Sequence, residues 1–424
     1  MATGAWRIGS ILLATLGTGF PAFAQTPGET ASHQHAPTFA SGTSWQPAAA
    51  TAHGLRLEPD GWTIIAHGHG TLAYVSEPDP RGDREVYVTS MAGVRASRRL
   101  GPGTLELRMM ASADPIMGSE GYPLLLQTGE TADGFRPLYD RQHPHDLFME
   151  IAALYRWRVG GVTPFLYLAP VGEPAFGPTA FPHRASGRDA PNAPIGHHHH
   201  DGTHLTYGVA TLGAVVGEGL KVEASVFRGR EPDEQRWNFE RPRLDSYAVR
   251  VTVNPGPRWS LQASVADIDA PEQIHPGLDV RKATVSMMYH RPFAAGSWSA
   301  TAVVGANRWD QRTVRVAGID FTVPARTQVA ALLESAVRVR RWTVFTRVEA
   351  AEKDELFDPF DTRHNEVYPV AKLDLGCVVD VTALGSAAFG VGASGSMHIL
   401  PDDLRTVYGG TPLSFRVFAR LALR

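Results

Sequence analysis

The chain has little of three things that would assign it to a common class of protein. It carries one cysteine, Cys377, in 424 residues, which excludes a disulfide framework and a cluster of thiolate metal ligands. Its formal net charge of −3 provides no basic field that would attract nucleic acid or an anionic lipid surface. Beyond the first 24 residues, no run of about 18 apolar residues occurs, so a helical membrane protein is excluded.

The first 24 residues have the organisation of a secretory signal peptide. Arg7 gives a positive start, IGSILLATLGTGF is an apolar stretch too short to span a bilayer, and AFA before Gln25 is a small-residue cleavage site. Residues 25–60 are rich in Thr, Ala, Pro, Gly and His without an apolar period, which predicts a flexible periplasmic tail that includes His33 and His35. Residues 61–424 contain no linker and are expected to form one domain.

In residues 61–424 the strongest signal is an alternation of apolar and polar residues. Alternate apolar residues from Tyr247 to Val253 share one face, and those from Leu413 to Leu421 share another, whereas Arg250, Arg416 and Arg420 lie on the opposite faces. A period of two is that of β-strands. We expect the two apolar faces to point outward.

Strands with one apolar and one charged face fit either a soluble sandwich or a membrane barrel with a polar lumen. Short links such as GEG and NPGP alternate with long ones such as residues 113–145 and 171–203, which favours an all-β, transmembrane, antiparallel up-and-down barrel. Trp259, Trp298 and Trp342 follow short links, where an aromatic ring would lie at a membrane interface. We predict sixteen strands, within a range of 12–16, that begin near residues 62, 85, 104, 146, 162, 204, 219, 244, 258, 281, 296, 325, 342, 369, 385 and 412.

Charged strand residues are expected to face the lumen, because a charge at the lipid midplane costs about 2–4 kcal/mol. The predicted lumen-lining residues are His67, His69, Arg250, Lys282, Glu334, Arg338, Arg347, Lys372, Asp374, Arg416 and Arg420. Both signs of charge occur among them, so weak ion selectivity is expected.

Three segments carry a resemblance: DRQHPHDLFMEIAALYRW, PVGEPAFGPTAFPHRAS and VFRGREPDEQRWNFERPRLDSY. They are similar to segments of a family of uncharacterised, porin-like outer-membrane proteins of Gram-negative bacteria. The resemblance covers most of the chain after residue 24 and implies a barrel in the cell outer membrane. It implies no catalytic residue.

Histidine is concentrated in two neighbouring long loops. The candidate metal ligands are His143, His145 and Asp146 in RQHPHD, and His183, His197, His198, His199, His200, Asp201 and His204 in the next long loop. Imidazole with occasional carboxylate suits zinc, copper or nickel, although a barrel requires no cofactor. We hypothesise that the two loops converge at the outer mouth or constriction and bind such ions loosely, with binding lost below about pH 6 as imidazoles protonate. Alternatively, these histidines only hydrogen-bond neighbouring loops.

No nucleophile elbow, HExxH helix or phosphate loop occurs, so we expect no enzymatic activity. The first functional interpretation is a passive channel for small solutes or ions, with the second His-rich loop as its constriction. The alternative is a non-conducting surface-binding or assembly barrel with loops packed as a plug or, less favoured, an outer-membrane hydrolase. The expected partners are outer-membrane lipid, the barrel assembly machinery and small solutes or ions, and nucleic acid is not among them.

Overall fold

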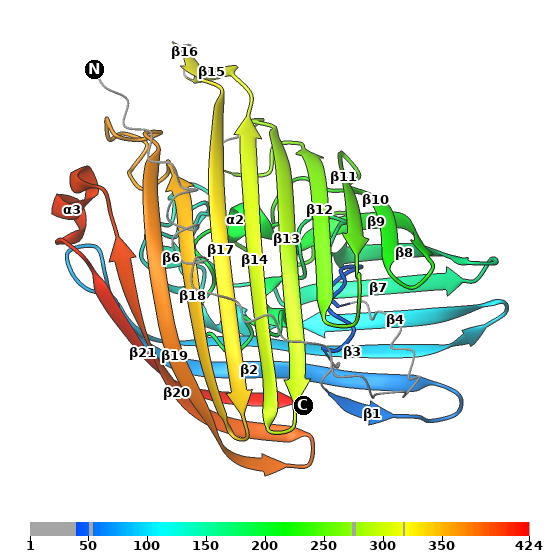
Figure 1. Cartoon of the computed structure of the whole chain (residues 1–424). Coiled ribbons are helices and arrows are strands. Elements are labelled where there is room, and N and C mark those ends of the chain that lie inside the picture. Colours follow the sequence, from blue (N-terminus) through cyan, green and yellow to red (C-terminus); the bar gives the residue numbers. More distant parts are fainter. Residues whose placement is uncertain (1–39, 51–53, 274–276, 317–318, 424) are drawn as a thin grey trace. The chain divides into compact units, whose positions relative to one another are not determined.

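The computed structural model describes residues 40–50, 54–273, 277–316 and 319–423, all of which lie within one compact unit, Pro37–Arg424. Among these residues, sixteen long antiparallel strands form a closed barrel wall (Figure 1). The wall closes because β21 (Leu413–Leu423) pairs with β20 (Ala387–Ile399) on one side and with β2 (Thr63–Ser76) on the other. The predicted fold class and the predicted number of strands are confirmed.

Every wall strand begins within two residues of its predicted first residue. Between β2 and β20 the wall strands are β3 (Arg84–Leu100), β4 (Gly103–Ala111), β7 (Phe148–Trp157), β8 (Val162–Gly172), β9 (Thr206–Val216), β10 (Leu220–Phe227), β11 (Ser246–Val253), β12 (Trp259–Ile268), β13 (Val280–Phe293), β14 (Gly296–Trp309), β17 (Arg326–Val339), β18 (Trp342–Lys353) and β19 (Tyr368–Leu384). Each pairs with its neighbours in sequence order, apart from the short elements between them. The barrel is therefore an up-and-down barrel.

The remaining elements are short. β1 (Leu55–Leu57) adds to β2, β5 (Tyr122–Pro123) pairs with β6 (Arg141–Gln142), and β15 (Arg312–Val316) forms a hairpin with β16 (Ile319–Val323) beyond the wall (Figure 1). Two 3₁₀ turns, η1 (Asp114–Met117) and η2 (Phe181–His183), and two helices, α2 (His197–His200) and α3 (Asp402–Tyr408), lie in loops. No helix in the described part of the chain is long and apolar enough to cross a membrane.

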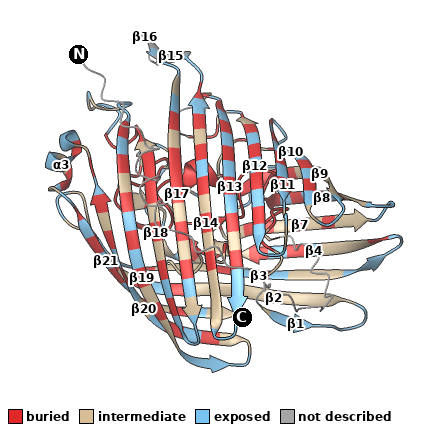
Figure 2. Ribbon diagram, in the orientation of Figure 1, coloured by how far each residue is buried: buried red, intermediate tan, exposed pale blue. Residues whose placement is uncertain are grey.

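The wall has an apolar outer face and a mixed inner face, on which charged and polar residues alternate with apolar clusters that include Phe165, Phe227 and Phe345. Burial alternates along the strands (Figure 2), and the predicted outward residues are exposed, with Tyr247 at 57% and Leu413 at 65%. Trp259, Tyr289 and Trp298 form an aromatic group near the short links, with ring centroids 4.5 Å and 5.1 Å apart in successive pairs. An apolar band with aromatic residues at its edge is the surface that a barrel presents to lipid.

The prediction for residues 25–60 is wrong in part. Ser41, Thr43, Ser44 and Trp45 are buried, each at 3% exposure or less, and they lie inside the wall rather than outside it. The cause is a set of charged wall residues that bind this segment's main chain, which a reading of its composition cannot reveal. The predicted signal peptide and the tail histidines His33 and His35 lie outside the described residues.

Candidate functional site

The lumen is crossed by the long connection from β8 to β9, residues 173–205, which we call the lumen loop. Its backbone and side chains make hydrogen bonds and ion pairs with wall side chains on β3, β10 to β14, β17 to β19 and β21. The pairs are Ala175–Ser225, Gly177–Ser264, Gly177–Arg250, Arg184–Glu334, Ser186–Thr301, Asp189–Arg420, Pro191–Tyr87, Asn192–Arg347, Asn192–Asp374, Gly196–Glu349 and His198–Lys282. The charges that line the wall therefore hold the loop in place.

The strongest anchor of the lumen loop is a buried network of two arginines and two carboxylates. Arg184 Nε lies 2.9 Å from Glu334 Oε2 and Arg184 Nη1 lies 2.7 Å from Asp201 Oδ2. Arg347 on β18 donates to the same Glu334 at 3.0 Å. All four side chains are at most 2% exposed. Charge-assisted hydrogen bonds of this kind are strong where water is excluded, because an unpaired buried charge is costly.

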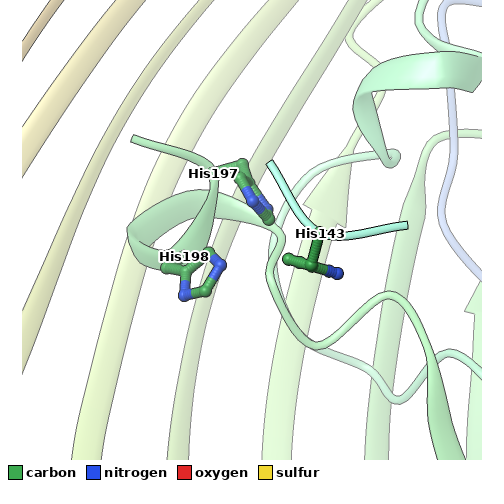
Figure 3. A group of neighbouring side chains, drawn as sticks. All are labelled: His143, His197 and His198. Carbon is green, nitrogen blue, oxygen red and sulfur yellow. The ribbon is translucent and has the colours of Figure 1, made fainter. Parts of the chain in front are cut away.

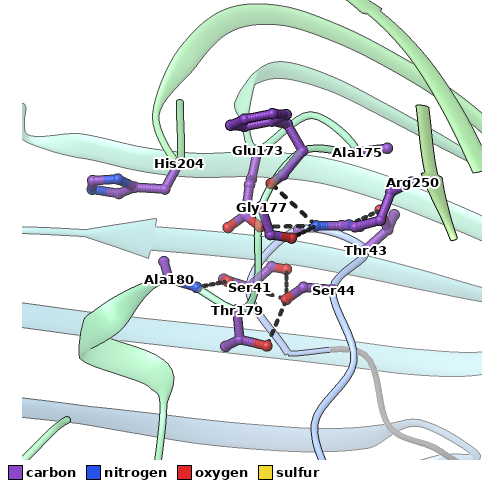
Figure 4. A network of polar contacts seen from close by, with 12 residues as sticks. Ser41, Thr43, Ser44, Glu173, Ala175, Gly177, Thr179, Ala180, His204 and Arg250 are labelled. Atoms are coloured by element: carbon purple, nitrogen blue, oxygen red, sulfur yellow. Dashed lines mark hydrogen bonds and ion pairs between the residues drawn. The ribbon is translucent and has the colours of Figure 1, made fainter. Parts of the chain in front are cut away.

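Residues 40–50, here called the N-terminal segment, lie beneath the lumen loop. Arg250 on β11 donates to Gly177 O at 2.9 Å and to Thr43 Oγ1 at 3.0 Å, so one guanidinium joins both segments (Figure 4). Lys221 donates to Thr43 O, and its ammonium lies 5.1 Å from the centre of the Trp45 ring. The N-terminal segment and the lumen loop thus form one packed layer inside the wall.

The structure places the predicted lumen-lining residues on the inner face. Eight of them are buried: Arg250, Lys282, Glu334, Arg347, Lys372, Asp374, Arg416 and Arg420. His67 and His69 are half-buried. The eleventh, Arg338, lies near the short-link end, where its side chain is 30% exposed and 3.6 Å from Asp380. His67 and His69 point inward from β2, with His67 facing His183 of the lumen loop at 6.1 Å between ring centroids.

The two His-rich loops converge, as predicted. His143, His145, His197, His198 and His204 line one cavity, and we call them the histidine cluster. Ring centroids are 4.2 Å apart for His197 and His198, 6.1 Å for His143 and each of those two, and 5.2 Å for His145 and His204. Figure 3 shows His143 approaching the His197–His198 turn from the opposite loop. The cluster lies among buried loop residues, on the long-loop side of the barrel.

Other predicted ligands lie outside the cluster. The His200 ring lies against the wall, where it and the main-chain oxygen of His199 approach Gly305 of β14. Asp146 accepts hydrogen bonds from Tyr207 at 2.6 Å and from Arg236 at 3.2 Å, so its carboxylate is already used. Of the four histidines in the helical turn α2, the first two therefore line the cavity and the last two do not, which their spacing in the sequence could not show.

The expectation of free imidazoles with a pKa near 6.5 is wrong for the buried loop histidines. Burial lowers the pKa of His198 to about 3, and neighbouring cationic groups oppose its protonation further. Burial also lowers the pKa of His200 and His204 to about 4. These rings are therefore neutral at pH 7 and still mostly neutral at pH 5.5, where the sequence-based hypothesis expected them to be charged.

Two cavities share His143 and His145 among their lining residues. The first contains the rest of the histidine cluster together with Glu130, Glu231 and Arg236 from the long loops. The second lies deeper, between the lumen loop and the inner face of β2 and β3, and its lining includes His69, Thr89 and Arg188. The lumen loop therefore leaves space against one side of the wall.

Sequence reasoning missed several residues of this region. Asp114 in η1 is 2% exposed and accepts a hydrogen bond from Ser90 N at 2.7 Å and one from His145 Nδ1 at 2.9 Å. Glu130 lies 3.3 Å from His143 Nε2. Nothing in the sequence around Asp114 marks it, because its role depends on contact with a residue 31 positions away.

The fold is similar to that of solved outer-membrane proteins. OmpF of Salmonella typhi, solved in complex with daunomycin, has a TM-score of 0.53 and 10% identity over 87% of this chain and 100% of its own. The outer membrane channel DcaP of Acinetobacter baumannii has a TM-score of 0.50 and 10% identity over 88% of this chain and 100% of its own. At these identities the likeness concerns the fold alone. No protein-family model and no curated protein sequence matches the chain, so membership of the porin-like family stays a prediction.

Proposed function

We propose that the protein is an outer-membrane channel of a Gram-negative bacterium that passes small solutes or ions through a narrowed lumen. The observation that carries the proposal is the cavity between the lumen loop and the inner face of β2 and β3, which shares His143 and His145 with a second cavity among the long loops, in a barrel with the fold of outer-membrane channels. A lumen lined by paired charges and narrowed by an inward-folded loop selects by size and charge. Insertion by the barrel assembly machinery belongs to the same proposal, since the chain has to reach its membrane from the periplasm.

One observation favours a second function, that of a barrel closed by its own loop. The lumen loop is bonded to wall strands on most sides, and the N-terminal segment fills space beneath it. In this alternative the protein conducts only after the loop has moved, and its long loops bind a partner at the cell surface. The two functions differ in the conductance of the unmodified protein.

The test is single-channel recording of the refolded protein in a planar bilayer, with a blocking substitution and a matched control. Thr89 lines the deeper cavity from the inner face of β3. Thr89→Trp places a large ring in the route, and we expect it to lower the conductance several-fold. The control is Val88→Trp, one residue earlier on the same strand, whose side chain points to lipid.

The expected result is a small, steady conductance that falls in Thr89→Trp and persists in Val88→Trp. A silent wild type would contradict the open channel and support the closed barrel. A conductance that both variants leave unchanged would show that ions take a different route.

A further inference from the structure

We propose that the histidine cluster binds one divalent transition-metal ion at the facing nitrogens of His145 and His204, with His197 and Asp201, which lie beside His204, as candidates for the remaining ligands. This inference goes beyond the proposed function, because binding does not require that the barrel conducts. It concerns one end of the first cavity, where loop residues from β4–β7 and β8–β9 meet.

The central observation is a pair of imidazole nitrogens that face each other. His145 Nε2 lies 3.1 Å from His204 Nε2. The other nitrogen of each ring is already fixed: His145 Nδ1 lies 2.9 Å from Asp114 Oδ2, and His204 Nδ1 lies 2.7 Å from Asp201 O. A carboxylate and a carbonyl oxygen only accept, so each Nδ1 carries the proton and donates it.

It follows that both facing nitrogens carry lone pairs. Two lone pairs at 3.1 Å repel each other unless a positive centre lies between them. Zinc–imidazole bonds are about 2.0–2.1 Å long, so two nitrogens at this separation would subtend an angle of about 100° at one ion. That angle lies between the values for square-planar and tetrahedral coordination, the geometries adopted by copper and zinc sites.

Two further candidate ligands lie beside His204. His197, Asp201 and His204 each offer a ligand atom, and these three atoms lie within 4.8 Å of one another, although His145 is not part of this group. His197 is 2% exposed, and neither of its ring nitrogens has a hydrogen-bond partner among the described residues. Asp201 Oδ2 accepts a hydrogen bond from Arg184. Asp201 Oδ1 is buried and has no hydrogen-bond partner among the described residues. Unsatisfied buried polar atoms are costly, and an ion would satisfy both.

The surroundings of the cluster are those of a built metal site. A ligating histidine commonly donates its second N–H to a carboxylate or carbonyl, which fixes its orientation. Asp114 does this for His145 and is itself held by Ser90 N, while the main chain does it for His204. No pattern in the sequence predicts these orienting hydrogen bonds.

A second group competes for one of the ligands. His143, His197 and His198 also offer ligand atoms within 4.8 Å of one another (Figure 3). A neutral imidazole has one free lone pair, so His197 can ligate one ion at a time. We therefore expect one tightly bound ion per chain, and we assign it to the group that has oriented nitrogens.

The experiment is titration calorimetry with Zn²⁺ and Cu²⁺ on the full mature protein, refolded in detergent and freed of metal with a chelator. The wild type should bind one ion per chain. His145→Ala/His204→Ala should lower the affinity at least about 100-fold, and Asp114→Asn, which leaves all ligands in place, should lower it about 10–100-fold. The electron paramagnetic resonance spectrum of bound Cu²⁺ should show nitrogen ligands, fewer in the double variant.

The matched control is His199→Ala/His200→Ala, which removes two histidines of the same helical turn that do not line the cavity. It should bind as the wild type does, and heat-modifiable mobility on gels should show that every variant keeps a folded barrel. Absence of binding in the wild type would overturn the proposal. Equal losses in the control and the ligand variant, or loss only in His143→Ala/His198→Ala, would overturn the assignment to His145 and His204.

Discussion

The wall of the barrel and the segments inside it are specified in different ways. Along β11 the outward residues are apolar and the inward ones polar, and this rule repeats from strand to strand. The lumen loop follows no such rule, although it is as well buried, because its position depends on individual pairs such as Arg184 with Glu334. Contact with lipid requires only that outward residues are apolar, whereas packing inside the lumen requires specific pairs of side chains.

This difference predicts how each region fails. A charged side chain on the outer face would disturb membrane insertion of the whole barrel, since each strand pairs with its neighbours. A lost anchor in the lumen would release the loop and leave the wall closed.

Removal of the central anchor, Arg184→Ala, should have the largest effect. It leaves Glu334 with one arginine and Asp201 with none of its present partners, and breaking a buried ion pair costs about 3–5 kcal/mol. We expect the lumen loop to detach and the single-channel conductance to rise several-fold, with larger fluctuations.

The control for this variant is Arg136→Ala, which breaks an exposed ion pair with Asp133 in another long loop. It should leave the conductance unchanged, since exposed pairs contribute little. An Arg184→Ala barrel that conducts as the wild type does would show that the loop is held by its other contacts.

A charge on the outer face should act on the wall instead. Val249 lies in the middle of β11 and is 41% exposed, so Val249→Arg places a cation near the lipid midplane at a cost of about 2–4 kcal/mol. Folding into vesicles, followed by heat-modifiable mobility, should show a lower yield of folded barrel. Tyr247→Arg, nearer the end of the same outer face, should cost about 0–1 kcal/mol. Equal yields for both variants would place the membrane elsewhere on the wall.

The strands of the wall could be predicted from the sequence because the alternation of apolar and polar residues is a local pattern. Each strand could be recognised from its own residues, and the alternation of short and long links set the order. The N-terminal segment could not be recognised in this way. Thr43 and Trp45 are held by Lys221 and Arg250, about 180 to 210 positions away, and no local pattern marks such a pairing.

The histidine cluster could be predicted in outline only. Two dense loops predicted that imidazoles would meet, and His143, His197 and His198 do meet. The sequence did not indicate that His199 and His200 would lie outside the cavity lining or that Asp114 would orient His145. These outcomes depend on the direction of single side chains, which only the packed lumen determines.

The smallest expected effect of a single side chain is the part of the lumen's pH dependence that His183 supplies. Other buried histidines of the lumen loop, such as His198 and His204, also have lowered pKa values and add to the total. Burial lowers the pKa of His183 well below its ordinary value of 6.5, and the groups that face it, His67, His69, Arg95 and His204, all oppose a positive charge. Released from the lumen, this histidine would regain its ordinary pKa. Below pH 6.5 the released loop therefore binds a proton that the packed loop does not, so packing is fully stable above pH 6.5 and weakens as the pH falls.

At pH 5.5 this weakening amounts to at most about 1.4 kcal/mol for one histidine. Hydrogen exchange of the lumen loop, corrected for its intrinsic pH dependence, should be faster at pH 5.5 than at pH 7.5, while exchange in β11 and β12 stays the same. His183→Asn should remove part of this difference, because asparagine does not titrate. Faster exchange in the wall as well would mean that lumen and wall open together, and the separation between the two regions would not hold.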